Sequence, residues 1–263
     1  MSGLKKHLGR CYIGLVLVLL YAPLAILIVC SFNKSKARTV WGGFTLHWYR
    51  DLFQNEEVLS ALRTSLMLTI AAALIAVILG TMACVGMTVM SRRSKNLLMN
   101  ITNIPMLNAD IVTVIAIMLL FARYFTLGFG SMLAAHVTLG IPYVLLNVMP
   151  RLQRASKGVY EAALDLGASE IYAFFSVVLP EIFPGIAAGF FFAFTVSMDD
   201  FVVTYFTKGP GINTISTMLY QQLRRGINPQ MYALSAIFLL VILLLLGIVN
   251  HITAKNTLEE KAS

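Results

Sequence analysis

Three aspartates stand in stretches of the sequence that are otherwise apolar: Asp110, Asp199 and Asp200. Placing an ionised carboxylate at the centre of a bilayer costs about 2.5–3.5 kcal/mol even on the most lenient scale. Such residues therefore face a helix bundle or a wet cavity, and they mark the paths of ions and substrates. No Lys or Arg stands beside them in the same stretches, so the unbalanced negative charge favours a cationic ligand.

The three carboxylates fall at two depths if each stretch forms one helix. At ~1.5 Å per residue, Asp110 lies ~18 Å and Asp199 ~27 Å from the start of its helix. Adjacent residues of a helix point ~100° apart, so only one of Asp199 and Asp200 can face a pathway. Asp199 shares its face with Phe192 and Thr195, and we expect this stripe to line the pathway. The alternatives are that the carboxyls are protonated and hydrogen-bonded between helices, and that Phe192 serves only in packing.

The composition indicates the class of protein that must hold these carboxylates. Of 263 residues, 58% are hydrophobic and only 12% are charged, against roughly 25% charged in a soluble domain. Disordered chains are poor in apolar residues, so disorder is excluded. The net charge of +8 could indicate nucleic-acid binding, but the basic residues lie between apolar runs rather than on one soluble face. The remaining class is a membrane protein that crosses the bilayer several times.

Six apolar stretches approach or exceed the ~20 residues that a helix needs to cross a bilayer. They cover about 11–32, 64–90, 97–122, 131–150, 181–206 and 232–252. The short loop 91–96 carries three basic residues, and basic loops stay in the cytoplasm. We therefore predict an all-α membrane protein of six transmembrane helices, with both termini in the cytoplasm. The first stretch is longer than a signal-peptide core and is predicted to be retained as a span.

The long segment 151–180, predicted to be cytoplasmic, has a helix–break–helix pattern. Residues 161–166 are good helix formers, Gly167 can take the left-handed conformation that ends a helix, and Ser169 is a suitable N-cap for the next one. Considered alone, this is only a helical hairpin between two spans. The chain carries no GxxxxGK[ST] phosphate loop, so any nucleotide energy must come from another subunit.

This segment resembles the signature of binding-protein-dependent ABC importer permeases: Glu-Ala-Ala, three residues, Gly, nine residues, Ile, one residue, Leu-Pro. The matching residues are Glu161, Ala162, Ala163, Gly167, Leu179 and Pro180. Val177 replaces the isoleucine. The resemblance implies the type I ABC importer permease fold, one permease unit over 1–263 with its core at about 60–252, and docking of an ATPase on the EAA segment, as we call 151–180.

Further motifs resemble the spermidine/putrescine permeases, of the PotC type: "WGGFTLHWY", "ADIV", "SMDDFVV" and "INPQMYAL". One departure is Asn108-Ala109 before Asp110, where that family commonly has Ser-Pro, and we expect a more regular helix there. The resemblance implies a permease subunit that passes polyamines across the bacterial inner membrane. Its implied partners are a homologous permease in a heterodimer, two ATPase subunits carrying ATP and Mg²⁺, and an extracytoplasmic substrate-binding protein. This chain itself is expected to catalyse no reaction and to bind no cofactor, metal or nucleic acid.

Other functions remain open from the sequence. A permease of the same fold could carry iron, thiamine, phosphonate or a similar substrate. An intramembrane aspartyl protease could use Asp110 and Asp199 as a proton-sharing pair, but such proteases usually carry a GxGD motif, which is not found here. A proton-coupled secondary transporter would also use membrane acids, but it leaves the EAA segment unexplained.

Overall fold

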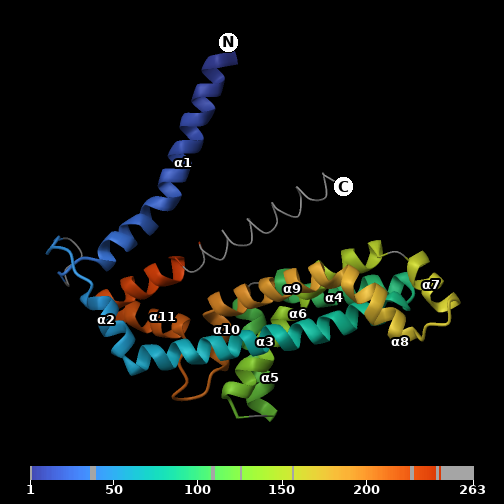
Figure 1. Ribbon diagram of the computed structural model, residues 1–263. Helices are drawn as coiled ribbons and strands as arrows, with labels where there is room; N and C mark the ends of the chain where they lie inside the picture. Colours follow the sequence, from blue (N-terminus) through green and yellow to red (C-terminus); the bar gives the residue numbers. More distant parts are fainter. Residues whose placement is uncertain are drawn as a thin grey trace. The chain divides into compact units, whose positions relative to one another are not determined.

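The computed structural model describes residues 2–35, 40–107, 110–124, 126–155, 157–225, 228–240 and 243. Within these residues the regular secondary structure is helical, and an isolated antiparallel bridge joins Asn33 and Phe44. The chain forms two compact units, one of Met1–Leu59 with Leu219–Ser263 and the other of Ser60–Met218. Each unit is described by itself, with the elements labelled in Figure 1. The predicted single permease unit over 1–263 stays a prediction.

The first unit contains the helices at the two ends of the described chain. These are α1 (Ser2–Ser31), α2 (His47–Gln54), the first turn of α3 (Glu56–Thr88), α11 (Ile215–Arg225) from Leu219 on, and the helix Pro229–Leu240. The segment between α1 and α2 is folded around Asn33, whose Oδ1 accepts the Gly42 N–H at 2.8 Å. The Trp48 indole N–H in turn donates to the Asn33 carbonyl at 2.7 Å. The connection that follows the first predicted span, 11–32, therefore contains a structured turn and a short helix.

The second unit carries the predicted functional residues. Its helices are α3 (Glu56–Thr88, from Ser60 on), α4 (Arg92–Leu107), α5 (Asp110–Tyr124), α6 (Phe129–Arg154), α7 (Lys157–Asp165), α8 (Glu170–Ala173), the π-helical turn η1 (Phe174–Val178), α9 (Leu179–Asp199), α10 (Val202–Thr207) and the start of α11 (Ile215–Arg225).

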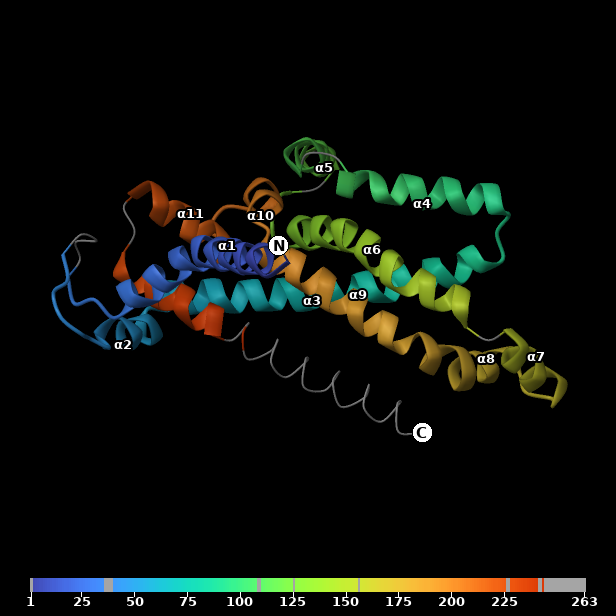
Figure 2. The ribbon, with the colours of Figure 1, turned by 90° about the horizontal axis from the view of Figure 1, so that it is seen from above.

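Helices α3, α6 and α9 pack together because glycines let their backbones approach closely, as is usual between membrane helices (Figure 2). A Cβ on Gly80 of α3 would lie 2.8 Å from Val144 Cγ1 of α6. A Cβ on Gly189 of α9 would lie 3.1 Å from the Val144 Cα, and one on Gly185 would lie 2.8 Å from the Asn147 carbonyl oxygen. Buried small and aliphatic side chains fill the remaining space.

The membrane-spanning pattern agrees with the predicted fold class. Four described helices are long and apolar enough to cross a membrane: Tyr12–Ser31, Glu56–Thr88, Phe129–Arg154 and Glu170–Asp199. The other two predicted spans overlap the shorter apolar helices Ile111–Tyr124 and Pro229–Leu240. Of the predicted span 232–252, the part after residue 240 lies outside the described residues, except residue 243. The chain is a multi-pass helical membrane protein, and the orientation of its termini stays a prediction.

The third predicted span, 97–122, contains parts of two described helices. Helix α4 ends at Leu107 and α5 begins at Asp110, and the two helices run in different directions in both views (Figures 1 and 2). The expectation of a more regular helix concerns Asn108-Ala109, and these two residues lie outside the described part of the chain.

The fifth predicted span, 181–206, differs at both ends. Helix α9 stops at Asp199, because Asp200 is extended (φ −71°, ψ 114°) and its carboxylate accepts the Val203 N–H of α10 at 2.7 Å. At the other end, the helix that Ser169 caps continues through η1 into α9.

The continuation through η1 depends on one wide turn. The Leu179 N–H donates to the Phe174 carbonyl, five residues back. Pro180 has no N–H to donate and its ring crowds the carbonyl four residues before it, so a wide turn relieves the helix just ahead of the proline.

Candidate functional site

The break after α9 separates the roles of its two aspartates. Asp200 is used structurally: its carboxylate caps α10, and its carbonyl oxygen accepts the hydroxyls of Thr204 and Ser216, each at 3.1 Å. The Asp199 side chain is exposed, and no group in the described part of the chain is its hydrogen-bond or ion-pair partner. The helix break therefore places the two side chains in different surroundings, and which of them faces a pathway stays a prediction.

The predicted stripe is present on α9. Phe192, Thr195 and Asp199 lie on one face of the helix and all three are exposed within this chain. The Thr195 hydroxyl donates to the Phe191 carbonyl of its own helix at 2.7 Å. The opposite face of α9, with Gly189 and Ala193 among its buried residues, packs on α6 and α3. The stripe is therefore available to another molecule, while its role in a pathway stays a prediction.

Asp110 is the first residue of α5, and its side chain lies outside the described part of the structure. The position of its helix is nevertheless informative. Val114 of α5, Ala135 of α6 and Val203 of α10 form one buried cluster. The N-terminal halves of α5 and α10 therefore belong to one packed layer, whereas the sequence had predicted two separate depths for the aspartates of the two spans.

A buried polar cluster fixes this layer, and sequence reasoning missed it. His136 of α6 is only 3% exposed. Its Nδ1 lies 3.0 Å from the Ser197 Oγ at the end of α9, and its Nε2 lies 3.0 Å from the Thr204 Oγ1 of α10. The sequence did carry a signal, because a polar residue inside an apolar helix must find hydrogen-bond partners when it is buried. Among the described residues, no group of three or more His, Cys, Asp or Glu side chains could hold a metal ion.

The EAA segment folds locally as the sequence predicted. Gly167 has a φ of +89° and follows α7. Its N–H donates to the Leu164 carbonyl at 2.9 Å, and the Ala168 N–H donates to the Ala163 carbonyl at 3.0 Å, which together form a Schellman end. Ser169 then caps α8, with its Oγ accepting the Tyr172 N–H.

The same segment exposes apolar side chains that the motif does not include. Leu166 is 90% exposed, and large side chains of α8 and η1 are also exposed: Ile171, Tyr172 and Phe175. Of the predicted coupling residues, Glu161 and Ala162 are exposed, as is Pro180, whereas Ala163 and Leu179 are half-buried. Exposed apolar patches of this kind mark surfaces that bind other proteins or lipid. The structure thus adds an apolar surface to the predicted coupling residues.

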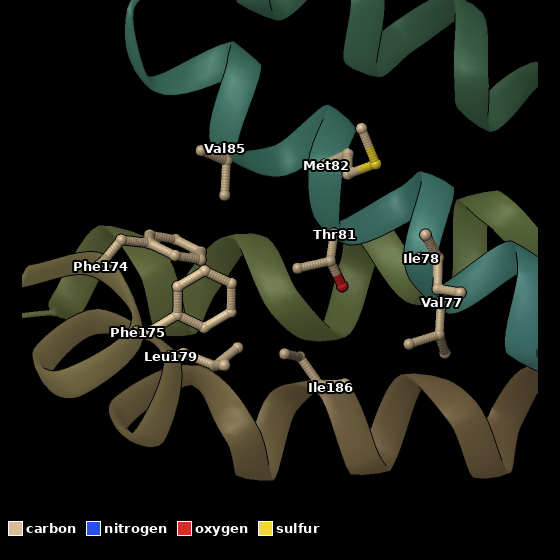
Figure 3. A pocket seen from close by; sticks show the side chains of 9 residues that line it. All are labelled: Val77, Ile78, Thr81, Met82, Val85, Phe174, Phe175, Leu179 and Ile186. Atoms are coloured by element: carbon tan, nitrogen blue, oxygen red, sulfur yellow. The ribbon is translucent and has the colours of Figure 1, made fainter. Parts of the chain in front are cut away.

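An apolar cavity of about 510 Å³ lies between α3 and the η1–α9 junction. Its walls are aliphatic and aromatic, with Thr81 as the polar exception (Figure 3): Val77, Ile78, Thr81, Met82, Val85, Phe174, Phe175, Leu179 and Ile186. The Thr81 Oγ1 is buried and has no hydrogen-bond partner in the described structure. Leu179 of the Leu-Pro pair therefore lines a cavity as well as following the wide turn.

These features define a helical membrane transport subunit, and sequence comparison gives its family. Residues 72–257 match the family described as "Binding-protein-dependent transport system inner membrane component", and the chain belongs to this family. It is 37% identical, over 228 residues, to the putrescine transport system permease protein PotI of Escherichia coli K12, covering 84% of this chain and 81% of that protein. It is 36% identical to the spermidine/putrescine transport system permease protein PotC of the same organism, covering 90% of each chain. These relatives are transport permeases rather than enzymes.

Solved structures show the same fold at low sequence identity. A bacterial ABC transporter involved in the import of the acidic polysaccharide alginate has a chain that superposes with a TM-score of 0.71 at 17% identity, covering 97% of this chain and 96% of that one. The alginate transporter in complex with a periplasmic protein bound to an alginate pentasaccharide gives a TM-score of 0.69, also at 17% identity, covering 94% and 92%. The type I permease fold is thereby confirmed for this chain.

Proposed function

We propose that this chain is a permease subunit of an ATP-driven importer that passes polyamines, spermidine or putrescine, across the bacterial inner membrane. The observation that carries the proposal is the exposed carboxylate of Asp199 at the end of α9, which has no hydrogen-bond or ion-pair partner among the described residues. A linear polyamine combines positive charges with methylene linkers. The carboxylate can bind an ammonium group, and the Phe192 ring on the same face can contact a cation or a methylene stretch.

The proposed substrate agrees with the names of the relatives, a putrescine permease and a spermidine/putrescine permease. Those permeases and this chain are similar over most of their lengths. An anionic substrate such as a phosphonate would be repelled by an unneutralised Asp199, so the exposed carboxylate favours the cation.

The proposed assembly has three kinds of partner. A second, homologous permease covers the exposed stripe of α9 and encloses the pathway. An ATPase dimer, which holds ATP and Mg²⁺, docks on the EAA segment, where Leu166 and the α8 side chains supply an apolar surface. A substrate-binding protein docks on the extracytoplasmic side. Glu161, Ala162 and Ala163 lie in α7, directly before the rigid helix end at Gly167, so movement of the ATPase at α7 is transmitted to α8 and α9.

The test is ATP-dependent uptake of radiolabelled putrescine and spermidine by proteoliposomes containing the full complex. Uptake is expected to be competed by unlabelled polyamines and unaffected by iron, thiamine or phosphonates. The Asp199→Asn complex is expected to lose uptake, while Glu57→Gln, which removes an exposed negative charge at the first turn of α3, keeps it. Competition by one of the other substrates, without competition by polyamines, would assign the chain to a different cargo.

A further inference from the structure

The ring of His136 connects three helices of the second unit where α9 ends. Its two nitrogens reach Ser197 of α9 and Thr204 of α10, both at 3.0 Å, and both hydroxyl-bearing residues are buried, at 6% and 1% exposure. The partners lie 61 and 68 positions away in the sequence. A ring held by two buried hydroxyls has one orientation available, because turning it would leave at least one polar group unpaired.

The direction of each hydrogen bond follows from the number of hydrogens available. The Thr204 hydroxyl has one hydrogen, and it donates that hydrogen to the Asp200 carbonyl oxygen at 3.1 Å. Thr204 must therefore accept from His136, so the Nε2 of the ring carries a hydrogen. In the neutral ring Nδ1 is then the acceptor, and the Ser197 hydroxyl donates to it. The chain of bonds runs from Ser197 through His136 and Thr204 to the backbone of Asp200.

The end of this chain of bonds is the residue that breaks the helix. The Asp200 carbonyl oxygen also accepts the Ser216 hydroxyl, and its carboxylate accepts the Val203 N–H. If α9 continued as an α-helix through Asp200, these bonds could not form in their present geometry, and Asp199 would no longer stand at a helix end. A second tether between α6 and α10, from the Ser131 Oγ to the Thr207 carbonyl at 2.9 Å, holds the far end of α10.

We propose that His136 is a positioning residue for substrate passage: by connecting Ser197 to Thr204, it maintains the break after α9 that presents the Asp199 carboxylate. The inference rests on the proposed polyamine function only in naming the substrate. His136 is buried beneath the break and touches no substrate. Its effect on transport is transmitted through the Asp200 backbone to Asp199.

The first experiment uses variants that keep one bond at a time. The Nε of Gln occupies about the place of the His Nε2 and can keep the bond to Thr204, whereas Asn reaches only the place of Nδ1 and can keep the bond to Ser197. We expect His136→Leu to raise the KM for polyamine uptake by about fivefold to tenfold, the size of effect expected from losing one or two buried hydrogen bonds. His136→Gln should restore most of the affinity and His136→Asn little of it.

Thr138→Val is the matched control, because the Thr138 hydroxyl is exposed and bonds only the Ala134 carbonyl of its own helix. In an Asp199→Asn background, His136→Leu should add no further increase in KM, since both changes act on the same carboxylate. Equal rescue by Asn and Gln, or effects of His136 and Asp199 that add in full, would overturn the proposal.

A second measurement needs no substrate. Amide hydrogen exchange of the full complex should be faster in α10, at Val203 above all, in His136→Leu than in Thr138→Val. Unchanged exchange there would also overturn the positioning role. Absence of polyamine uptake by the unaltered complex would instead contradict the proposed function, and the exchange measurement would still decide what His136 does.

Discussion

The two ends of α9 are built on different principles. At the Asp199 end, the buried hydroxyls of Ser197 and Thr204 are paired through His136, and directional bonds set the backbone. At the Leu179 end, the surroundings are apolar, a cavity is open between helices, and the buried Thr81 hydroxyl has no partner in the described structure. One end is fixed by hydrogen bonds with defined geometry. The other is lined mainly by apolar side chains, and such non-directional contacts can be rearranged by a partner.

The largest expected effect is on polyamine uptake, when the carboxylate charge at the Asp199 end of α9 is removed. Asp199→Asn should reduce polyamine uptake by about 10- to 100-fold, the range for losing a hydrogen bond to a charged group. Asp200→Asn should change uptake little, because Asn caps a helix about as well as Asp does. Asp200→Ala should weaken the cap by about 1 kcal/mol. Uptake by each variant at matched expression checks the order, which would be contradicted by equal losses in the two Asn variants.

The next effect concerns the part of α9 that packs closely on α6 at Gly185. Gly185→Ala would place a Cβ 2.8 Å from the Asn147 carbonyl oxygen and 2.9 Å from the Arg151 Cγ. We expect a loss of about 1–3 kcal/mol of stability, typical of overpacking, seen as a lower thermal unfolding midpoint in detergent. Gly86→Ala is the control, since nothing lies within 4 Å of its added Cβ in α3. A Gly185→Ala protein as stable as the control would show that α6 and α9 can separate easily.

A smaller effect concerns the EAA segment. Gly167→Ala forces a residue with a Cβ into a φ of +89°, which costs about 1–2 kcal/mol although the space around it is open. The helix end should lose its fixed geometry while the spans remain folded, so substrate-stimulated ATPase activity of the complex should fall and membrane insertion should not. Gly158→Ala, in open space within α7 and without a positive φ, is the matched control. Normal coupling in Gly167→Ala would contradict the role proposed for this helix end.

The smallest expected effect is a change in stability at the apolar Leu179 end of α9. Thr81→Val replaces a buried, unpartnered hydroxyl with a methyl group of similar size. Stability should rise, by up to about 1 kcal/mol, because the hydroxyl is desolvated without a compensating bond. Thr204→Val, a similar change at the other end, should lower stability. Thermal unfolding of both variants would decide, and two changes of the same sign would remove the contrast between the ends.

Structural features that depend on only a few neighbouring residues were predicted correctly from the sequence. Gly167 ends a helix and Ser169 begins one because left-handed glycines and serine caps use only neighbouring backbone groups. The four long apolar helices also overlap runs of apolar residues that predicted spans. The membrane itself imposes this regularity, since backbone groups in lipid must be paired within the helix.

The break after Asp199 could not be predicted in the same way. Its supporting hydroxyls come from Ser216, and from Thr204 through a histidine on another helix, so the decisive bonds join residues that are distant in sequence. The prediction of one helix over 181–206 rested on its apolar residues. It did not include the possibility that the Asp200 carboxylate caps a new helix. The same limit applies to the exposed side chain of Leu166, which nothing in the local pattern distinguishes from a core leucine.

The wide turn at Phe174–Val178 has a mechanical consequence. An extra residue in a helical turn lets a helix shift locally, because the carbonyl oxygens can exchange their N–H partners one at a time without unfolding the helix. Here the wide turn cannot move along the helix, because Pro180 has no N–H with which the next turn could form its hydrogen bond. A torque on the EAA segment is therefore transmitted to the glycine contacts of α9 through a fixed joint, whose place the Leu-Pro pair sets.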